Sequence, residues 1–132
     1  APTHPLATRK QLTIKECAAY TLVLPDESWP LRDKLNHELD SANVDLGATT
    51  TSNSVEFLRA MLAKQEVIGF QTIIGIEINL EEKSLIHVPL ISSSGVPLTQ
   101  VFSVGVNENH PHSDIFEKAL MLLKRRLYDY VS

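Results

Sequence analysis

The stretch TTTSNSVEFLRAMLAKQEVIGFQT, residues Thr49–Thr72, contains the signals of a strand, a helix and a second strand. Its threonines favour extended chain because β-branched side chains fit a pleated surface. Asn53 is expected to cap the helix, and Glu56 three residues later fits a capping box. Apolar residues then recur at helical spacing, so Arg59 is expected on the polar face of the helix, facing water. The apolar run Val67–Phe70 follows and is typical of a buried strand. The stretch predicts a βαβ unit and hence an α/β fold.

Capping and spacing signals place further elements on both sides of this unit. The expected elements are a helix Ile14–Ala19 with a Thr13 and Glu16 capping box, a strand Thr21–Leu24, a helix from about Trp29 to Ala42 capped by Ser28, strands at Leu85–Leu90 and Leu98–Asn107, and a last helix from a Ser113 cap to about Tyr130. The segment Ile73–Leu80 fits either a strand or a short helix.

Composition limits the classes of protein to consider. A chain of 132 residues fits one domain, and its single cysteine, Cys17, excludes a disulfide framework. A net charge of -4, with acidic residues scattered along the sequence, argues against nucleic-acid binding by this chain itself. The sequence shows neither a membrane span nor a signal peptide, so we expect a soluble, cytoplasmic protein that does not contact membranes.

No residue pattern indicates catalysis or a metal site. The five histidines are dispersed, and His110 and His112 lack a supporting ligand. There is no serine elbow and no glycine-rich phosphate loop, and Cys17 on a short apolar helix is expected to be buried and inert. We therefore expect no enzyme activity, no cofactor and no metal.

The last helix is apolar over more than one face. Its apolar residues are Ile115, Phe116, Ala119, Leu120, Leu122, Leu123, Leu127 and Tyr130. Such a helix needs more cover than a small domain supplies. We expect the chain to self-associate through it.

Five segments together carry a resemblance to a known family. They are HPLA (His4–Ala7), LTIKECAAYTLVLP (Leu12–Pro25), Arg32 after WPL, NSVEFLRAML (Asn53–Leu62) and IGFQTIIGIEINLEEKSLIHVPL (Ile68–Leu90). In this order and spacing the chain resembles the effector-binding region of LysR-type transcriptional regulators, over nearly its whole length.

The resemblance implies a periplasmic-binding-protein-like fold of type 2, with two α/β lobes around an effector cleft. Residues 1–106 would form the second lobe, a mixed sheet flanked by helices. Residues 107–132, preceded by a return strand near Val101–Val106, would hold a helix of the first lobe. The rest of that lobe and a winged helix-turn-helix, the part that binds DNA, would be absent. In the order of elements typical of the family, the segment Ile73–Leu80 would be a short helix.

The sequence departs from the family pattern in two places. Gln65, Glu66 and Val67 stand where a Gly-x-Gly turn is usual, and Thr72 stands where a proline is usual. These changes alter the floor of the implied cleft, and they put Gln71 and Thr72 there as hydrogen-bonding groups.

The resemblance also implies where an effector would bind. The candidate residues are Pro25, Asp26, Ser28, Trp29, Thr51, Ser52, Asn53, Ser54, Phe70, Gln71 and Thr72. Two helix N-termini favour a small carboxylate or similar anion, although Asp26 and Glu27 oppose it and Arg32 is the only nearby cation. The alternative is purely structural, since Ser28 and Asn53 are expected as caps in any case and Trp29 and Phe70 are typical core residues.

Two classes of function remain open on this basis. One is ligand-responsive control of transcription, in which a small-molecule effector changes a homo-oligomer that contacts DNA only through the absent domain. The other is a stand-alone solute-binding or protein-interaction module. With half of the cleft absent, we expect the isolated chain to bind an effector weakly.

Overall fold

The computed structural model describes residues 1–47, 49–64, 66–101, 103 and 114–131. Its elements run in the order β1 (Leu12–Thr13), α1 (Ile14–Cys17), β2 (Leu22–Pro25), α2 (Pro30–Ser41), β3 (Thr49–Ser52), α3 (Val55–Lys64), β4 (Ile68–Gly69), α4 (Glu77–Glu81), β5 (Leu90–Ile91) and α5 (Asp114–Val131). They belong to two compact units, Ala1–Gln100 and Val101–Ser132.

Three parallel strands form the central sheet of the first unit, in the order β3-β2-β4. Leu22 at the start of β2 pairs with Thr49 of β3 on one side and with Ile68 of β4 on the other. The expected strand, helix and strand of the βαβ unit are present, with β2 between the two strands of that unit. The carboxyl ends of all three strands therefore lie at one edge of the sheet.

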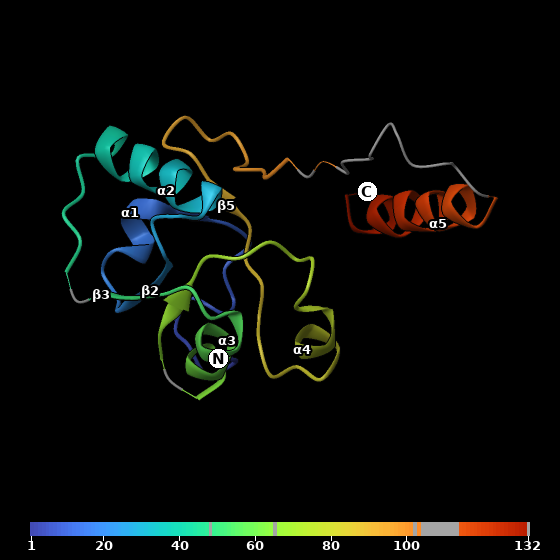
Figure 1. Ribbon diagram of the computed structural model, residues 1–132. Helices are drawn as coiled ribbons and strands as arrows, with labels where there is room; N and C mark the ends of the chain where they lie inside the picture. Colours follow the sequence, from blue (N-terminus) through green and yellow to red (C-terminus); the bar gives the residue numbers. More distant parts are fainter. Residues whose placement is uncertain (48, 65, 102, 104–113, 132) are drawn as a thin grey trace. The chain divides into compact units, whose positions relative to one another are not determined.

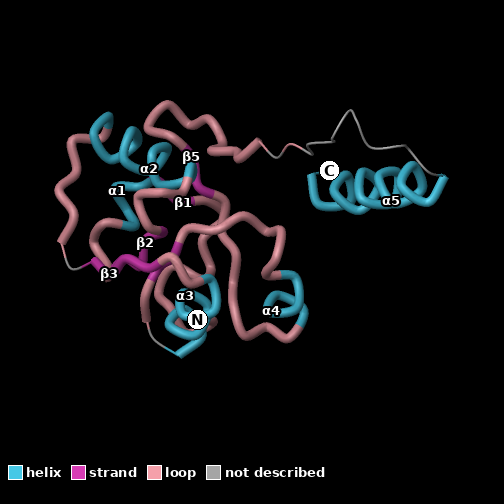
Figure 2. Tube along the Cα trace, viewed as in Figure 1, coloured by secondary structure: helices cyan, strands magenta, loops and turns pink. Residues whose placement is uncertain are grey.

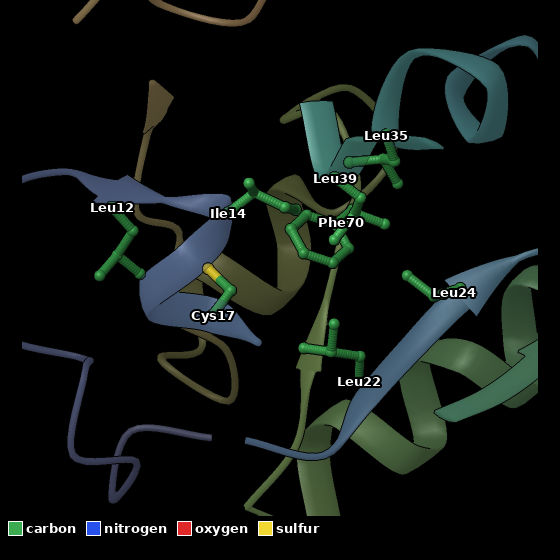
Figure 3. Close-up of a cluster of buried hydrophobic side chains, with 8 residues drawn as sticks. All are labelled: Leu12, Ile14, Cys17, Leu22, Leu24, Leu35, Leu39 and Phe70. Carbon is green, nitrogen blue, oxygen red and sulfur yellow. The ribbon is translucent and has the colours of Figure 1, made fainter. Parts of the chain in front are cut away.

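Alternate residues of β2 belong to different hydrophobic layers, as the two-residue period of a strand requires. Leu22 and Leu24 pack with α1 and α2, and Val23 packs with α3. The helices α1 and α2 lie on one side of β2, and α3 lies on the other (Figure 1). The first layer comprises Leu12, Ile14, Cys17, Leu22, Leu24, Leu35, Leu39 and Phe70 (Figure 3). The second comprises Val23, Leu58, Leu62, Val67 and Leu85. The sheet is thus covered on both faces, as expected for parallel strands.

A second, two-stranded sheet joins β1 to β5 in parallel (Figure 2). An antiparallel bridge between Ile91 and Pro97 adds the one described antiparallel pairing. The strand prediction for Leu85–Leu90 is wrong except at Leu90. Its alternation has another cause, because Leu85 packs in the α3 layer while Ile86 is exposed, in a segment that forms no strand before Leu90.

The segment after β4 resolves the choice left open for Ile73–Leu80 in favour of the helix. The chain turns at Gly75, whose φ of 92° favours glycine, and α4 begins two residues later. Gly75 N–H donates to Glu77 Oε2 at 2.7 Å, which fixes this turn. The isoleucines do not alternate across a sheet, since Ile76 is buried and Ile78 is exposed at the start of a helix.

The capping box at α1 is confirmed. Glu16 N–H donates to Thr13 Oγ1 at 3.3 Å, and Thr13 N–H donates to Glu16 Oε2 at 2.8 Å. The helix ends at Cys17, two residues earlier than expected. Cys17 itself is buried, as predicted.

The described part of the second unit is essentially α5. The helix was expected to reach about Tyr130 and ends at Val131, but its expected cap, Ser113, lies outside the described residues. Its side chains Ile115 and Leu122 are 80% and 63% exposed. The strand expected at Leu98–Asn107 is not formed at 98–101 or 103, and the remainder, including most of the expected return strand, lies outside the described residues. No helix in the described ranges has the length and hydrophobicity needed to cross a membrane.

Candidate functional site

The candidate site lies at the carboxyl edge of the three-stranded sheet. The register pairs Pro25, the last residue of β2, with Ser52, the last residue of β3. Asp26 N–H then donates to Ser52 O at 3.0 Å, so the pairing continues one residue into the loop. This bond holds the loop before α2 beside the loop before α3, and it brings together two groups of residues that the sequence placed in the site.

The start of α2 is built around Asp26 and not around Ser28. Asp26 Oδ1 accepts from Ser28 N–H at 3.0 Å, and Asp26 O accepts from Trp29 N–H at 3.1 Å. Trp29 is the N-cap and makes no side-chain capping bond, so the prediction of a Ser28 cap is wrong. An aspartate two residues earlier supplies the competing turn. The Ser28 N–H also holds the pKa of Asp26 below its usual value.

The start of α3 is capped one residue later than expected. Ser54 Oγ accepts from Phe57 N–H at 3.2 Å, and Ser52 Oγ accepts from Ser54 N–H at 3.0 Å. The Asn53 cap is therefore a wrong prediction. Because the helix begins at Val55, Asn53 lies outside it, exposed, and its side chain makes no hydrogen bond within the described chain. Its amide is the polar group in this loop that no local bond uses.

Two predicted site residues are core residues instead. The Phe70 ring lies among Leu24, Leu35 and Leu39 and is only 9% exposed (Figure 3). Pro25 is fully buried. Both side chains are therefore buried within the unit and offer a ligand little or no surface.

The remaining candidates keep some accessible surface. Thr51 is exposed, and Trp29, Gln71 and Thr72 are half-buried. Thr72 Oγ1 donates weakly to Ile74 O, at 3.4 Å. Polar groups with solvent access therefore border the edge from all three loops.

Arg32 projects from the first turn of α2 to the end of β2. Its Nη1 donates to Pro25 O at 3.0 Å, and its Nε donates to Asn36 Oδ1 at 2.9 Å. The side chain is half-buried. The cation that the sequence placed nearby is thus bonded to the edge of the sheet.

Arg59 is a second cation close to this edge, and the prediction that it faces water is wrong. Its Nε is buried without a hydrogen-bond partner among the described residues, and its Nη2 lies 3.0 Å from where a Gly75 Cβ would be. The sequence held a signal for this position. Arg59 is four residues after Val55 and three before Leu62, which puts it at the border of the apolar stripe.

A cavity of about 330 Å³ lies near the other end of α2. It is lined by Asn36, Leu39, Asp40, Val44, Asp45 and Leu46. Nowhere in the described ranges do three or more His, Cys, Asp or Glu side chains gather as metal ligands.

Comparison with known proteins identifies the family. The family model for the LysR substrate binding domain matches residues 1–127. Among solved structures, the chain is similar to the regulatory domain of MetR, a LysR family regulator from N. meningitidis solved as a double cysteine mutant, with 19% identity and a TM-score of 0.56. The similarity covers 74% of this chain and 46% of the MetR chain, so this chain spans less than half of that regulatory domain. No match was found among curated proteins. The structural likeness supports the α/β, periplasmic-binding-protein-like fold.

Proposed function

Since this chain belongs to the family of LysR substrate-binding domains, we propose that it is the effector-sensing part of a transcriptional regulator and that its effector binds at the carboxyl ends of β2, β3 and β4. Ligands of open α/β sheets bind beyond the carboxyl ends of the strands, where connections leave in opposite directions. The ends of β2 and β3 form such a point, because the chain passes from β2 to β3 on one side and then from β3 across β2 to β4 on the other.

The bond from Asp26 N–H to Ser52 O is the observation that carries this proposal. It places the N-terminus of α2 beside that of α3, both helices having at least two turns. The N-terminus of a helix, through its partial positive charge and free backbone N–H groups, attracts a negative group by about 0.3 to 1 kcal/mol. A small molecule with an anionic group is the proposed effector. The negative charge of Asp26 would oppose the binding of an anion, so other groups at the sheet edge must contribute to the affinity.

The proposed mode of action involves parts of the regulator beyond the sheet edge. Residues 1–106 would form one lobe and the helix within 107–132 would belong to the other, so that effector binding favours one arrangement of the lobes. DNA contact would fall to a separate winged helix-turn-helix domain, since this chain has a net charge of -4. The regulator would act in the cytoplasm as a homo-oligomer.

An NMR titration of the 132-residue chain with a panel of small organic acids, amides and alcohols tests the location. Compounds that bind should first shift the backbone amides of 26–29, 51–54 and 70–72. Thr51→Ala and Asn53→Ala should each weaken binding several-fold without changing the fold, because both side chains are exposed.

Ser93→Ala is the matched control, because Ser93 is an exposed turn residue outside the sheet edge. It should leave every affinity unchanged. Binding that maps to another surface, or that ignores Thr51→Ala and Asn53→Ala alike, would contradict the proposed site.

A further inference from the structure

The direction of the Pro25 carbonyl places the Arg32 guanidinium within the sheet edge. In a strand, carbonyls of alternate residues point to the same side. Thr21 O accepts from Ile68 N–H on the β4 side of β2, and Pro25 has the same parity as Thr21. The neighbouring Asp26 N–H points the other way, to Ser52 O of β3. Arg32, bonded to Pro25 O, therefore lies at the end of β2 on the side where the chain continues from β4.

The charge of Arg32 is not neutralised by a carboxylate. The ion pair found among the described residues joins Arg9 to Glu16, and Arg32 has none. Both N–H groups of Nη2 and one of Nη1 have no protein acceptor in the described chain. Nη2 is not among the buried atoms that lack a partner, so it reaches solvent. Asp26, the carboxylate whose pKa the Arg32 charge helps to lower, is itself engaged by Ser28 N–H.

Two hydrogen bonds hold this cation in place before any ligand arrives. Asn36 lies one turn further along α2 and accepts from Nε, while Pro25 O fixes Nη1. A guanidinium presents its donors in a rigid planar fork that matches two oxygens of an oxoanion. Positioning it in advance reduces the conformational entropy lost on binding.

We infer that Arg32 is the residue that selects for an oxoanion group on the effector, a carboxylate above all, by donating from Nη2 at the carboxyl end of β2. This inference depends on the proposed effector site, and it goes further by naming the group that is recognised and the residue that recognises it.

The test compares acids with their neutral amides on the 132-residue chain by NMR titration up to tens of millimolar. The probes are benzoate with benzamide, succinate with succinamide, and inorganic sulfate and phosphate. The acids, but not the neutral amide probes, should shift the backbone N–H signals of residues 26–29, 31, 32 and 70–72. Arg32→Gln should weaken acid binding about tenfold or more, as expected for loss of a charged hydrogen bond.

Two further variants guard against a simple folding defect. Asp26→Asn keeps an oxygen for Ser28 N–H but removes the opposing charge, so it should strengthen acid binding. Lys10→Gln removes an exposed positive charge elsewhere and should change nothing.

The outcomes separate this inference from the proposed site. Amides that bind at the strand ends as tightly as acids, or acids that bind Arg32→Gln normally, overturn the role of Arg32 but leave the site intact. Shifts from sulfate and phosphate alone would also overturn selection for carboxylates. If no probe perturbs residues 26–32, 51–54 or 70–72, both the site and the inference fail.

Discussion

The backbone of Gly69 in β4 lies directly against the side chain of Leu62 in α3. A Cβ at position 69 would be 2.7 Å from Leu62 Cδ2 and 3.2 Å from its Cγ. Leu62 is buried in the α3 layer, so it has little room to move. The absence of a side chain at position 69 therefore sets how closely α3 approaches the sheet.

Gly69→Ala should lower the free energy of unfolding by about 1 to 3 kcal/mol, the usual range for overpacking a core. Urea denaturation measures this directly. Gly47→Ala is the matched control, because a Cβ there would meet nothing within 4 Å. A Gly69→Ala variant as stable as the Gly47→Ala variant would show that α3 can shift at no cost.

Ser54→Ala should destabilise the chain by about 1 kcal/mol, because the Phe57 N–H loses its side-chain acceptor at the start of α3. Asn53→Ala should have little effect on the melting curve, since no described residue bonds to that side chain. Thermal unfolding of the two variants side by side decides which residue is the cap. If Asn53→Ala proved the more destabilising of the two, Asn53 would be the cap, as the sequence alone predicts.

Stability should fall as the pH drops below about 6.5, because burial lowers the pKa values of His4 and His87 from that ordinary value. The unfolded chain then binds protons that the folded chain does not. His4 is 7% exposed, packs against the Tyr20 ring and accepts from Leu6 N–H through Nδ1, which protonation would prevent.

Urea unfolding from about pH 8 to about pH 5 measures this effect, with a slope of at most about 1.4 kcal/mol per pH unit for each histidine. Replacing both histidines with glutamine should reduce the slope below about pH 6.5, while the Ala1 amino group, whose pKa burial lowers from 8.0, still contributes from about pH 8. The lowered carboxyl pKa of Glu16 acts only at lower pH, as its capping bonds to Thr13 are lost. A slope that survives the double substitution would assign the effect to other groups.

Cys17 should react with a thiol reagent only when the chain unfolds. Burial raises the pKa of its thiol to about 12, and the residue is 1% exposed. The thiolate is the reactive form, so both its scarcity and its burial slow the reaction. Labelling rates followed through a urea transition should rise together with unfolding. Rapid labelling in the absence of urea would place Cys17 near the surface.

Self-association through α5 remains a prediction from the sequence, and the exposure of Ile115, Met121 and Leu122 supports it. Leu122→Glu should raise the dissociation constant about tenfold or more, since burying a leucine contributes about 1.5 to 3 kcal/mol. Lys124→Glu, an exposed position on the opposite side of α5 from Ile115 and Leu122, is the control. Analytical ultracentrifugation measures both, and a monomer over a wide concentration range would count against association.

Much of the fold could be predicted from spacing alone. Leu35 and Leu39 of α2 and Leu58 and Leu62 of α3 are buried as their helical period requires. The strand error at Leu85–Leu90 arose because a segment outside a sheet can alternate buried and exposed side chains as a strand does. Pairing depends on a partner far away in the sequence, and local pattern carries no information about it.

The proximity of the two loops was predictable from the sequence, but the bonds within them were not. The loops after β2 and β3 lie together as expected, yet both caps were assigned to the wrong residue. Neighbouring polar residues compete for the same N–H groups, and the outcome depends on where the helix begins. Arg59 was misplaced because a long side chain at the border of an apolar stripe can fold back over a glycine.

The alternation of Leu22, Val23 and Leu24 in β2 has an evolutionary consequence. The layers on its two faces share no buried side chain, since each of these residues belongs to one layer only. A substitution tolerated beneath α3 need not be matched by another beneath α2. The sequences of α2 and α3 could therefore change independently of each other while the sequence of β2 is retained.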